Sequence, residues 1–175
     1  AGLYAVITGV APVMTGLLEQ NSDVFGYQFA AIMTGHFVSA VIAGRLVHVL
    51  GIKKLLFLGT STCLIGGLIL LIASLLNTIN IYTILLPSTV FLIGFALTIP
   101  GMTAGALSNF QHMAGRATSL LGFIQHGIGA LVSITLGFIA DGSTPMPMAI
   151  FLAVTSLFAF ISFTIYIPKI ILKVD

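Results

Sequence analysis

The fold follows from one stretch of the sequence, residues 100–133, which reads PGMTAGALSNFQHMAGRATSLLGFIQHGIGALVS. Arg116 lies in its middle and is the only formally charged side chain between Leu55 and Ala140. The apolar runs on both sides of Arg116 are long enough to cross a bilayer, which takes about 20 apolar residues. We therefore expect two membrane-spanning helices joined by a short polar turn at residues 108–116.

The same stretch is rich in small residues, which let helix backbones approach closely in lipid. We predict helix-packing or gating roles for Pro100, Gly101, Gly105, Gly122, Gly129, Ser133 and Gly137. The second run also holds Gln125 and His126. Polar side chains are costly in hydrocarbon, so we expect these two to have a function.

The composition of the whole chain is that of an integral membrane protein. Of its 175 residues, 58% are hydrophobic and 6% are charged, whereas soluble domains carry about 25% charged residues. The apolar runs lack the strict alternation of a membrane β-barrel, so an all-α membrane protein is expected. The few basic residues are scattered, which excludes a nucleic-acid-binding face. Cys63 is the only cysteine, so neither an internal disulfide nor a cysteine-based metal site is expected.

The apolar runs predict six spans, at residues 1–18, 25–50, 55–76, 81–107, 117–140 and 148–167. We treat the chain as one unit, residues 1–175. Its first residue is already apolar and has no basic flank, so we expect it to start partway into a span of a longer protein. A signal peptide would need a positively charged N-terminal region.

With six spans, the basic residues and the acidic residues of the loops fall on opposite sides of the membrane. The boundaries after spans two, four and six carry every Lys and Arg: Arg45, Lys53, Lys54, Arg116, Lys169 and Lys173. The boundaries after spans one and five carry Glu19, Asp23 and Asp141. Basic residues in short loops stay in the cytoplasm, so we expect both chain ends to be cytoplasmic.

The spans also form two similar units of three. Spans one and four are interrupted by Pro and internal Gly, and spans two and five each carry one mid-span His. Spans three and six have no His, Gln, Pro or charge in mid-membrane. Two three-span units have opposite topology, and such inverted repeats with interrupted helices are typical of secondary transporters. The alternative is that Gly and Pro are simply common in membrane helices.

The turn after span two, residues 44–54, reads GRLVHVLGIKK. It resembles the signature loop of the major facilitator superfamily, G-x-L-x-D-x-x-G-x-[KR]-[KR]. The motif covers Gly44, Arg45, Leu46, Gly51, Lys53 and Lys54. His48 stands where the motif has Asp, which leaves the motif's charge relay unassigned here.

Residues 100–133 are similar to the tenth and eleventh spans of drug:proton antiporters of the bicyclomycin/chloramphenicol-resistance (Bcr/CflA) type. Pro100, Ala106, Leu107, Phe110, His112, Ala114, Gly115, Ala117, Ser119–Phe123, Gln125 and Gly129–Ser133 carry the resemblance. It is strong over the eleventh span and loose in the third, sixth and terminal segments. Arg116 departs from the small or polar residue usual in this family.

The resemblance implies a twelve-span transporter of the bacterial inner membrane, of which this chain is the C-terminal half. Its partners would be the lipid bilayer, an N-terminal six-span half and small amphipathic drugs, with the proton gradient as driving force and no cofactor. Spans one and four would line the cavity, two and five would face the other half, and three and six would face lipid.

We predict a substrate cavity lined by Tyr4, Thr8, Met14, Thr15, His36, Phe91, Phe95, Thr98, Gln125 and His126. Met and aromatic side chains suit varied apolar drugs. The alternative for each Phe is packing or lipid contact. For His36 and His126 the alternative is a hydrogen bond to a neighbouring helix.

No span contains a carboxylate, although proton coupling usually needs a titratable acid. The coupling acid is therefore expected in the other half, unless Glu19 or a His serves. No catalytic residue is predicted, because H-E-x-x-H and G-x-S-G protease motifs are absent from this sequence. A six-span channel, or a non-transporting membrane assembly subunit, stays open as the alternative function.

Overall fold

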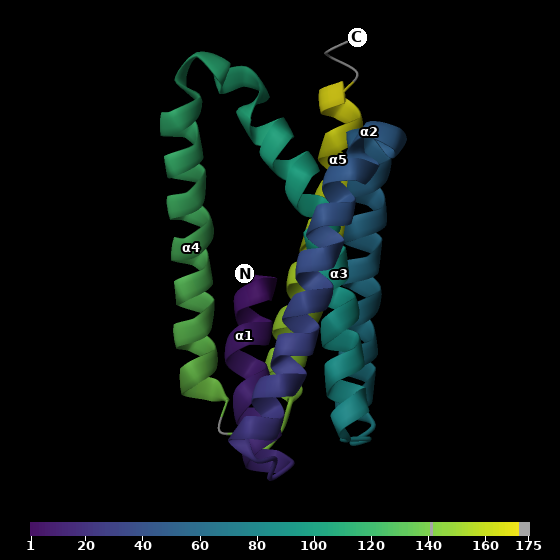
Figure 1. Ribbon diagram of the computed structural model, residues 1–175, viewed down its shortest axis with the longest axis vertical. Helices are drawn as coiled ribbons and strands as arrows, with labels where there is room; N and C mark the ends of the chain where they lie inside the picture. Colours follow the sequence, from purple (N-terminus) through teal and green to yellow (C-terminus); the bar gives the residue numbers. More distant parts are fainter. Residues whose placement is uncertain (141, 172–175) are drawn as a thin grey trace.

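The computed structural model describes residues 1–140 and 142–171, apart from the side chains at 108, 109, 111 and 166–171. All regular structure in this part of the chain is helical (Figure 1). The elements are α1 (Gly2–Pro12), η1 (Val13–Leu17), α2 (Ser22–Leu75), α3 (Ile81–Leu107), η2 (Ser108–Met113), α4 (Ala114–Ile139) and α5 (Met146–Ile171). The predicted all-α membrane class is confirmed.

Helix α2 contains both the second and the third predicted spans. Its 54 residues run up and back, and only Gly51 within it departs from helical dihedral angles, with φ 75° and ψ 161° (Figure 1). Glycine adopts a positive φ without the clash that a Cβ would cause. The predicted turn at residues 51–54 is therefore too long, because the reversal is concentrated at one residue.

The remaining boundaries fall close to those expected. Helix α3 covers residues 81–107 as predicted, while α4 and α5 begin three and two residues earlier than the predicted spans 117–140 and 148–167. Among the described residues, four helices are long and apolar enough to cross a membrane, and α2 is one of them. The first segment, Gly2–Leu17, is shorter. The total of six spans stays a prediction.

The first segment changes its winding after Pro12. Residues Val13–Leu17 form a π-helical turn, in which the Leu18 N–H donates to the Val13 carbonyl at 3.1 Å. Such turns interrupt helices locally and are frequent at functional sites. Pro12 predicted an interruption of this helix, but it did not indicate that the interruption would be a π-helical turn.

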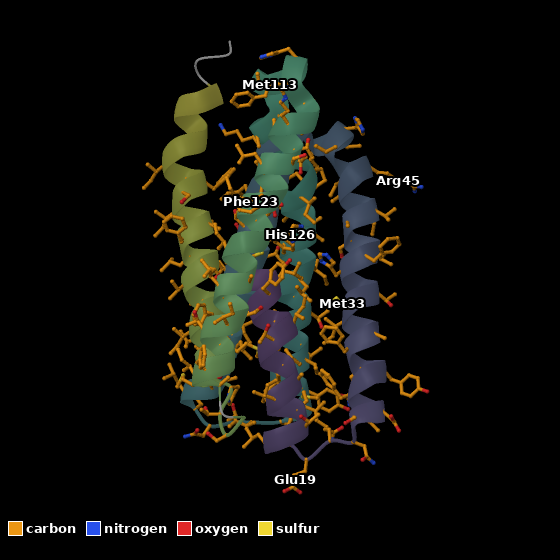
Figure 2. All side chains as sticks on the ribbon, turned by 90° about the vertical axis from the view of Figure 1, so that its left-hand side faces the viewer. Glu19, Met33, Arg45, Met113, Phe123 and His126 are labelled. Atoms are coloured by element: carbon orange, nitrogen blue, oxygen red, sulfur yellow. The ribbon has the colours of Figure 1, made fainter. Side chains whose placement is uncertain are left out.

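Among the described residues, basic and acidic side chains lie toward opposite ends of the long axis of the molecule. Arg45 lies toward one end together with Met113, and Glu19 lies at the other end (Figure 2). Lys53 and Lys54 flank the reversal in α2 at the same end as Arg45. Asp141 and Lys173 lie outside the described residues. Which end is cytoplasmic stays a prediction.

Helix α4 stands apart from the other long helices. It descends from the arch formed by η2, and the short α1 lies beside its lower part (Figure 1). Only Gly129 and Leu136 of α4 are buried. Its large apolar side chains Phe123, Leu131 and Phe138 are 76%, 65% and 89% exposed. The structure thus leaves an extended apolar face on α4.

Candidate functional site at the histidine contacts between helices

Helices α1 and α4 meet through a tyrosine and a histidine. The Tyr4 hydroxyl lies 2.5 Å from His126 Nδ1, and the two rings meet edge to face with centroids 6.2 Å apart. Gly129 lies three residues after His126 on the same helix face. A Cβ at Gly129 would collide with the Tyr4 ring, so the glycine makes room for the tyrosine.

A second polar contact follows along the same two helices. Thr8 Oγ1 and Ser133 Oγ lie 2.8 Å apart. Thr8 is four residues beyond Tyr4 and Ser133 is four beyond Gly129, so each pair shares a helix face. Together, Tyr4, Thr8, His126, Gly129 and Ser133 form what we call the α1–α4 seam. The sequence singled out all five residues but gave no sign that they meet.

The other mid-span histidine joins α2 to α3. His36 Nδ1 lies 3.0 Å from the Leu92 carbonyl oxygen. Because a carbonyl only accepts hydrogen bonds, the histidine is the donor. The imidazole also stacks on Phe95, with centroids 5.9 Å apart and an interplanar angle of 12°.

The two histidine contacts correspond to each other in the proposed repeat. His36 joins the second segment to the fourth, and His126 joins the fifth segment to the first. The histidines are 90 positions apart in the sequence, and their aromatic partners Tyr4 and Phe95 are 91 apart. An inverted repeat exchanges these pairs of helices, so the contacts support the repeat inferred from the sequence.

Three of the predicted cavity residues are buried inside the chain itself. Met14, Phe91 and Thr98 are 0%, 3% and 4% exposed. The Thr98 hydroxyl donates to the Phe95 carbonyl at 2.7 Å, and Phe91 lies against Gly66 of α2. Their predicted place on a cavity wall does not fit this structure, because burial leaves almost no surface for a ligand.

The other candidates are accessible. Thr15 and Gln125 are exposed, and the Thr15 hydroxyl donates to the Ala11 carbonyl of its own helix at 2.9 Å. The structure therefore brings the candidates together in two groups, at the α1–α4 seam and at His36. It does not gather all ten in one cavity. No group of three or more metal-ligating side chains occurs in the described residues.

The predicted packing glycines divide into two kinds. A Cβ at Gly101 would lie 2.9 Å from Leu56, so this glycine permits a close helix contact. A Cβ at Gly105, Gly122 or Gly137 would meet nothing within 4 Å. A packing role for these three stays a prediction, as does a role for Pro100.

The motif loop surrounds the reversal of α2. Leu46 packs on the small cluster of Ala43, Leu55 and Leu97, while Arg45, Lys53 and Lys54 are exposed. Gly51 provides the reversal itself, whereas a Cβ at Gly44 would meet open space. The loop therefore presents three cations at one end of the molecule.

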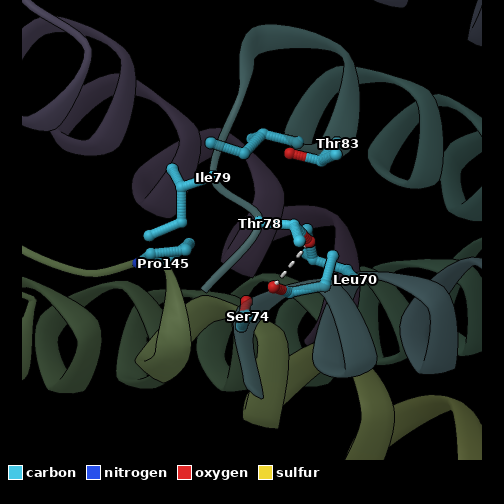
Figure 3. Close-up of a pocket in the computed structure, with 8 residues that line it drawn as sticks. Leu70, Ser74, Thr78, Ile79, Thr83 and Pro145 are labelled. Atoms are coloured by element: carbon cyan, nitrogen blue, oxygen red, sulfur yellow. Dashed lines mark hydrogen bonds between the residues drawn. The ribbon is translucent and has the colours of Figure 1, made fainter. Parts of the chain in front are cut away.

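The depressions in the described surface include the following two. One has a volume of about 280 Å³ where α3, η2 and α4 meet, and is lined by Ala106, Leu107, Phe110, Met113, Arg116, Ala117, Leu120, Leu121 and Ile124. Apart from the isolated Arg116, nothing in the sequence predicted this depression. The other lies beside Ser74 and Pro145 and has no room for a water molecule (Figure 3). Neither is a formed site for a drug-sized ligand within this chain.

The chain has relatives among curated bacterial proteins. It is 29% identical over 136 residues to "Multidrug resistance protein D" of Escherichia coli K12, covering 77% of the chain and 34% of that protein. It is 26% identical over 161 residues to "Uncharacterized MFS-type transporter YdgK" of Bacillus subtilis 168, covering 92% and 37%. It is 25% identical over 146 residues to "Bicyclomycin resistance protein homolog" of Haemophilus influenzae, covering 83% and 36%.

The chain is similar to drug-resistance transporters of the major facilitator superfamily. This similarity confirms the resemblance that residues 44–54 and 100–133 indicate. The chain spans about a third of the length of the curated relatives it matches. No family model matches the chain, and no solved structure does.

Proposed function

We propose that this chain is the C-terminal half of a proton-coupled secondary transporter that exports amphipathic drugs. The observation that carries the proposal is its similarity, over most of its length, to a multidrug resistance protein and a bicyclomycin resistance protein homolog. The two interrupted segments, with polar contacts at the depth of the histidines, support a central binding site. In this proposal the chain is not an enzyme and needs no cofactor.

The N-terminal half would cover the exposed apolar surface of α4. Side chains such as Phe123 and Phe138 are largely exposed, as expected for a helix that meets a second half. Alternating access would open the space between the halves to either side in turn. The protein would lie in the bacterial inner membrane, with the end carrying Arg45 and Arg116 in the cytoplasm.

The test uses the full-length protein in bacterial cells and three probes, ethidium, chloramphenicol and norfloxacin. We expect lower accumulation of at least one probe than in cells without the protein, and loss of that difference when an uncoupler collapses the proton gradient. Unchanged accumulation of every probe would overturn the efflux proposal. A symmetric oligomer of the chain that conducts ions in liposomes would instead support the channel alternative.

A further inference from the structure

We propose that His36 is the residue of this half at which a proton and a drug exchange, and that the exchange takes place at its Nε2 atom. The inference rests on the proposed function and names a residue and a class of substrate for it. Drugs with an O–H or N–H donor are the substrates that this chemistry selects.

The contact with Leu92 determines which nitrogen is free to react. His36 Nδ1 donates to the Leu92 carbonyl at 3.0 Å, so Nδ1 carries a proton in every charge state that keeps this bond. A neutral imidazole has one proton and one lone pair. The lone pair of neutral His36 is therefore on Nε2.

The Nε2 atom is available in this structure. No hydrogen bond to it occurs among the described residues, and it is not one of the two buried unpaired side-chain atoms, which belong to Gln28 and Ser74. The ring of Phe95 lies parallel to the imidazole at 5.9 Å. An aromatic face stabilises a cation at this distance. His36 can thus gain and lose charge while Leu92 and Phe95 hold the ring in place.

Few charged or titratable groups lie near His36 among the described residues. Helix α3, which packs against it, contributes the apolar residues Leu92 and Phe95 and has one titratable side chain, Tyr82, ten residues from Leu92 at the far end of the helix. On the second half of α2, the buried Cys63 thiol donates to the Phe91 carbonyl. On its own helix the nearest charges are Arg45 and Asp23, about 13 Å and 20 Å away along the axis.

The exchange of a proton for a drug follows because His36 Nε2 has a single lone pair, which can bind only one of them at a time. When His36 is neutral, Nε2 accepts a hydrogen bond from a drug O–H or N–H. When a proton from water binds Nε2, the lone pair is used and the same atom becomes a donor, so the drug loses its acceptor. Each drug bound displaces one proton to water, and each proton bound displaces one drug. This one-for-one competition is the requirement of an antiporter.

His126 differs from its counterpart in this respect. Its Nδ1 partner is the Tyr4 hydroxyl, which both donates and accepts. This contact therefore fits either tautomer of neutral His126 and does not place the lone pair at Nε2. The two related histidines have different chemistry because one meets a carbonyl and the other meets a hydroxyl.

The experiment compares the wild type with His36→Asn in full-length protein reconstituted in liposomes, with radiolabelled chloramphenicol as probe. Asparagine keeps a donor for the Leu92 carbonyl but does not titrate. For the wild type we expect the apparent affinity to fall on acidification, because a proton bound at Nε2 removes the acceptor of the drug. For His36→Asn we expect a lower affinity, because Nε2 is missing as the acceptor of the drug. We expect this affinity to be independent of pH within about twofold, and uptake driven by a pH gradient to be lost.

The matched control is His112→Asn, which changes an exposed histidine of η2 and keeps the wild-type pH dependence. A wild-type pH dependence in His36→Asn would overturn the inference. Wild-type affinity for chloramphenicol in His36→Asn would also overturn it, because Nε2 would then not be the acceptor of the drug. If the wild type itself shows no gradient-driven uptake, the proposed function fails instead.

Discussion

Two pairs of helices in this molecule are joined in opposite ways. Helices α2 and α3 touch through their backbones: a Cβ at Gly66 would lie 2.6 Å from the Phe91 nitrogen, and one at Gly94 would lie 2.5 Å from the Cys63 nitrogen. Helices α1 and α4 touch through the side chains of the α1–α4 seam, such as Tyr4 with His126. Close backbone contact replaces the hydrophobic effect as the source of helix association in lipid.

The difference indicates where this half can change shape at low cost. Separating α2 from α3 would remove many backbone-level contacts at once. Separating α4 from α1 would remove a few hydrogen bonds, each worth about 0.6 kcal/mol on average in a membrane protein. The pair with the weaker connection also carries the exposed apolar face of α4, which in our proposal meets the other half.

The largest effect is expected from Gly94→Ala. The added methyl group meets the Cys63 nitrogen at 2.5 Å and the Gly59 carbonyl at 2.7 Å, and backbone atoms cannot move aside as side chains do. We expect a loss of about 3 kcal/mol in the free energy of unfolding in detergent micelles. The matched control is Gly122→Ala, whose methyl group meets open space. A loss below about 0.5 kcal/mol at Gly94 would contradict the backbone contact.

An intermediate effect is expected from Gly129→Leu. The new side chain displaces the Tyr4 ring and breaks its contact with His126, but it meets a side chain instead of backbone. We expect membrane insertion to be retained, stability to fall by about 1–3 kcal/mol, and drug efflux to be lost. Efflux and expression are measured together, with Gly137→Leu as the control for a glycine in open space. Normal drug efflux by Gly129→Leu would show that transport does not require the α1–α4 seam.

The smallest effect is expected at the second contact of the seam. The cycle of Thr8→Val, Ser133→Ala and the double variant isolates the hydrogen bond between their hydroxyls. We expect a coupling energy of about 0.6 kcal/mol, measured by unfolding in micelles. Thr34→Val in place of Thr8→Val is the control, because the Thr34 hydroxyl donates to Ala30 of its own helix. A coupling energy as large as the loss of stability in Gly94→Ala would contradict the claim that α1 and α4 are joined more weakly than α2 and α3.

The elements of this fold were predictable from local sequence. The bilayer requires an apolar run of sufficient length in each span and places charged residues such as Arg45 and Glu19 at the ends of the spans. Both requirements apply to each segment separately. The bounds of α3 were predicted to the residue. The reversal at Gly51 was assigned too many residues, because sequence does not show that one glycine with positive φ suffices.

The arrangement of the candidate site was not predictable in the same way. His36 and His126 stand out as polar residues within apolar runs, but their partners Leu92 and Tyr4 depend on which helices become neighbours. The burial of Met14 and Phe91 was missed for a related reason. A helix that is apolar all around has no polar face, so the sequence does not indicate which side chains turn inward.

The central claim is that α4 is held to this half through α1, and a disulfide between Thr8→Cys and Ser133→Cys tests it most directly. Cys63→Ser removes the one cysteine of this chain, any cysteine in the rest of the full-length protein is replaced likewise, and the protein is oxidised in its native membrane. The two hydroxyl oxygens lie 2.8 Å apart, so we predict efficient cross-linking of this pair. We predict none for Thr8→Cys with Phe138→Cys, whose side chain points away at 89% exposure. No cross-link for the first pair, or equal cross-linking of both, would contradict the account.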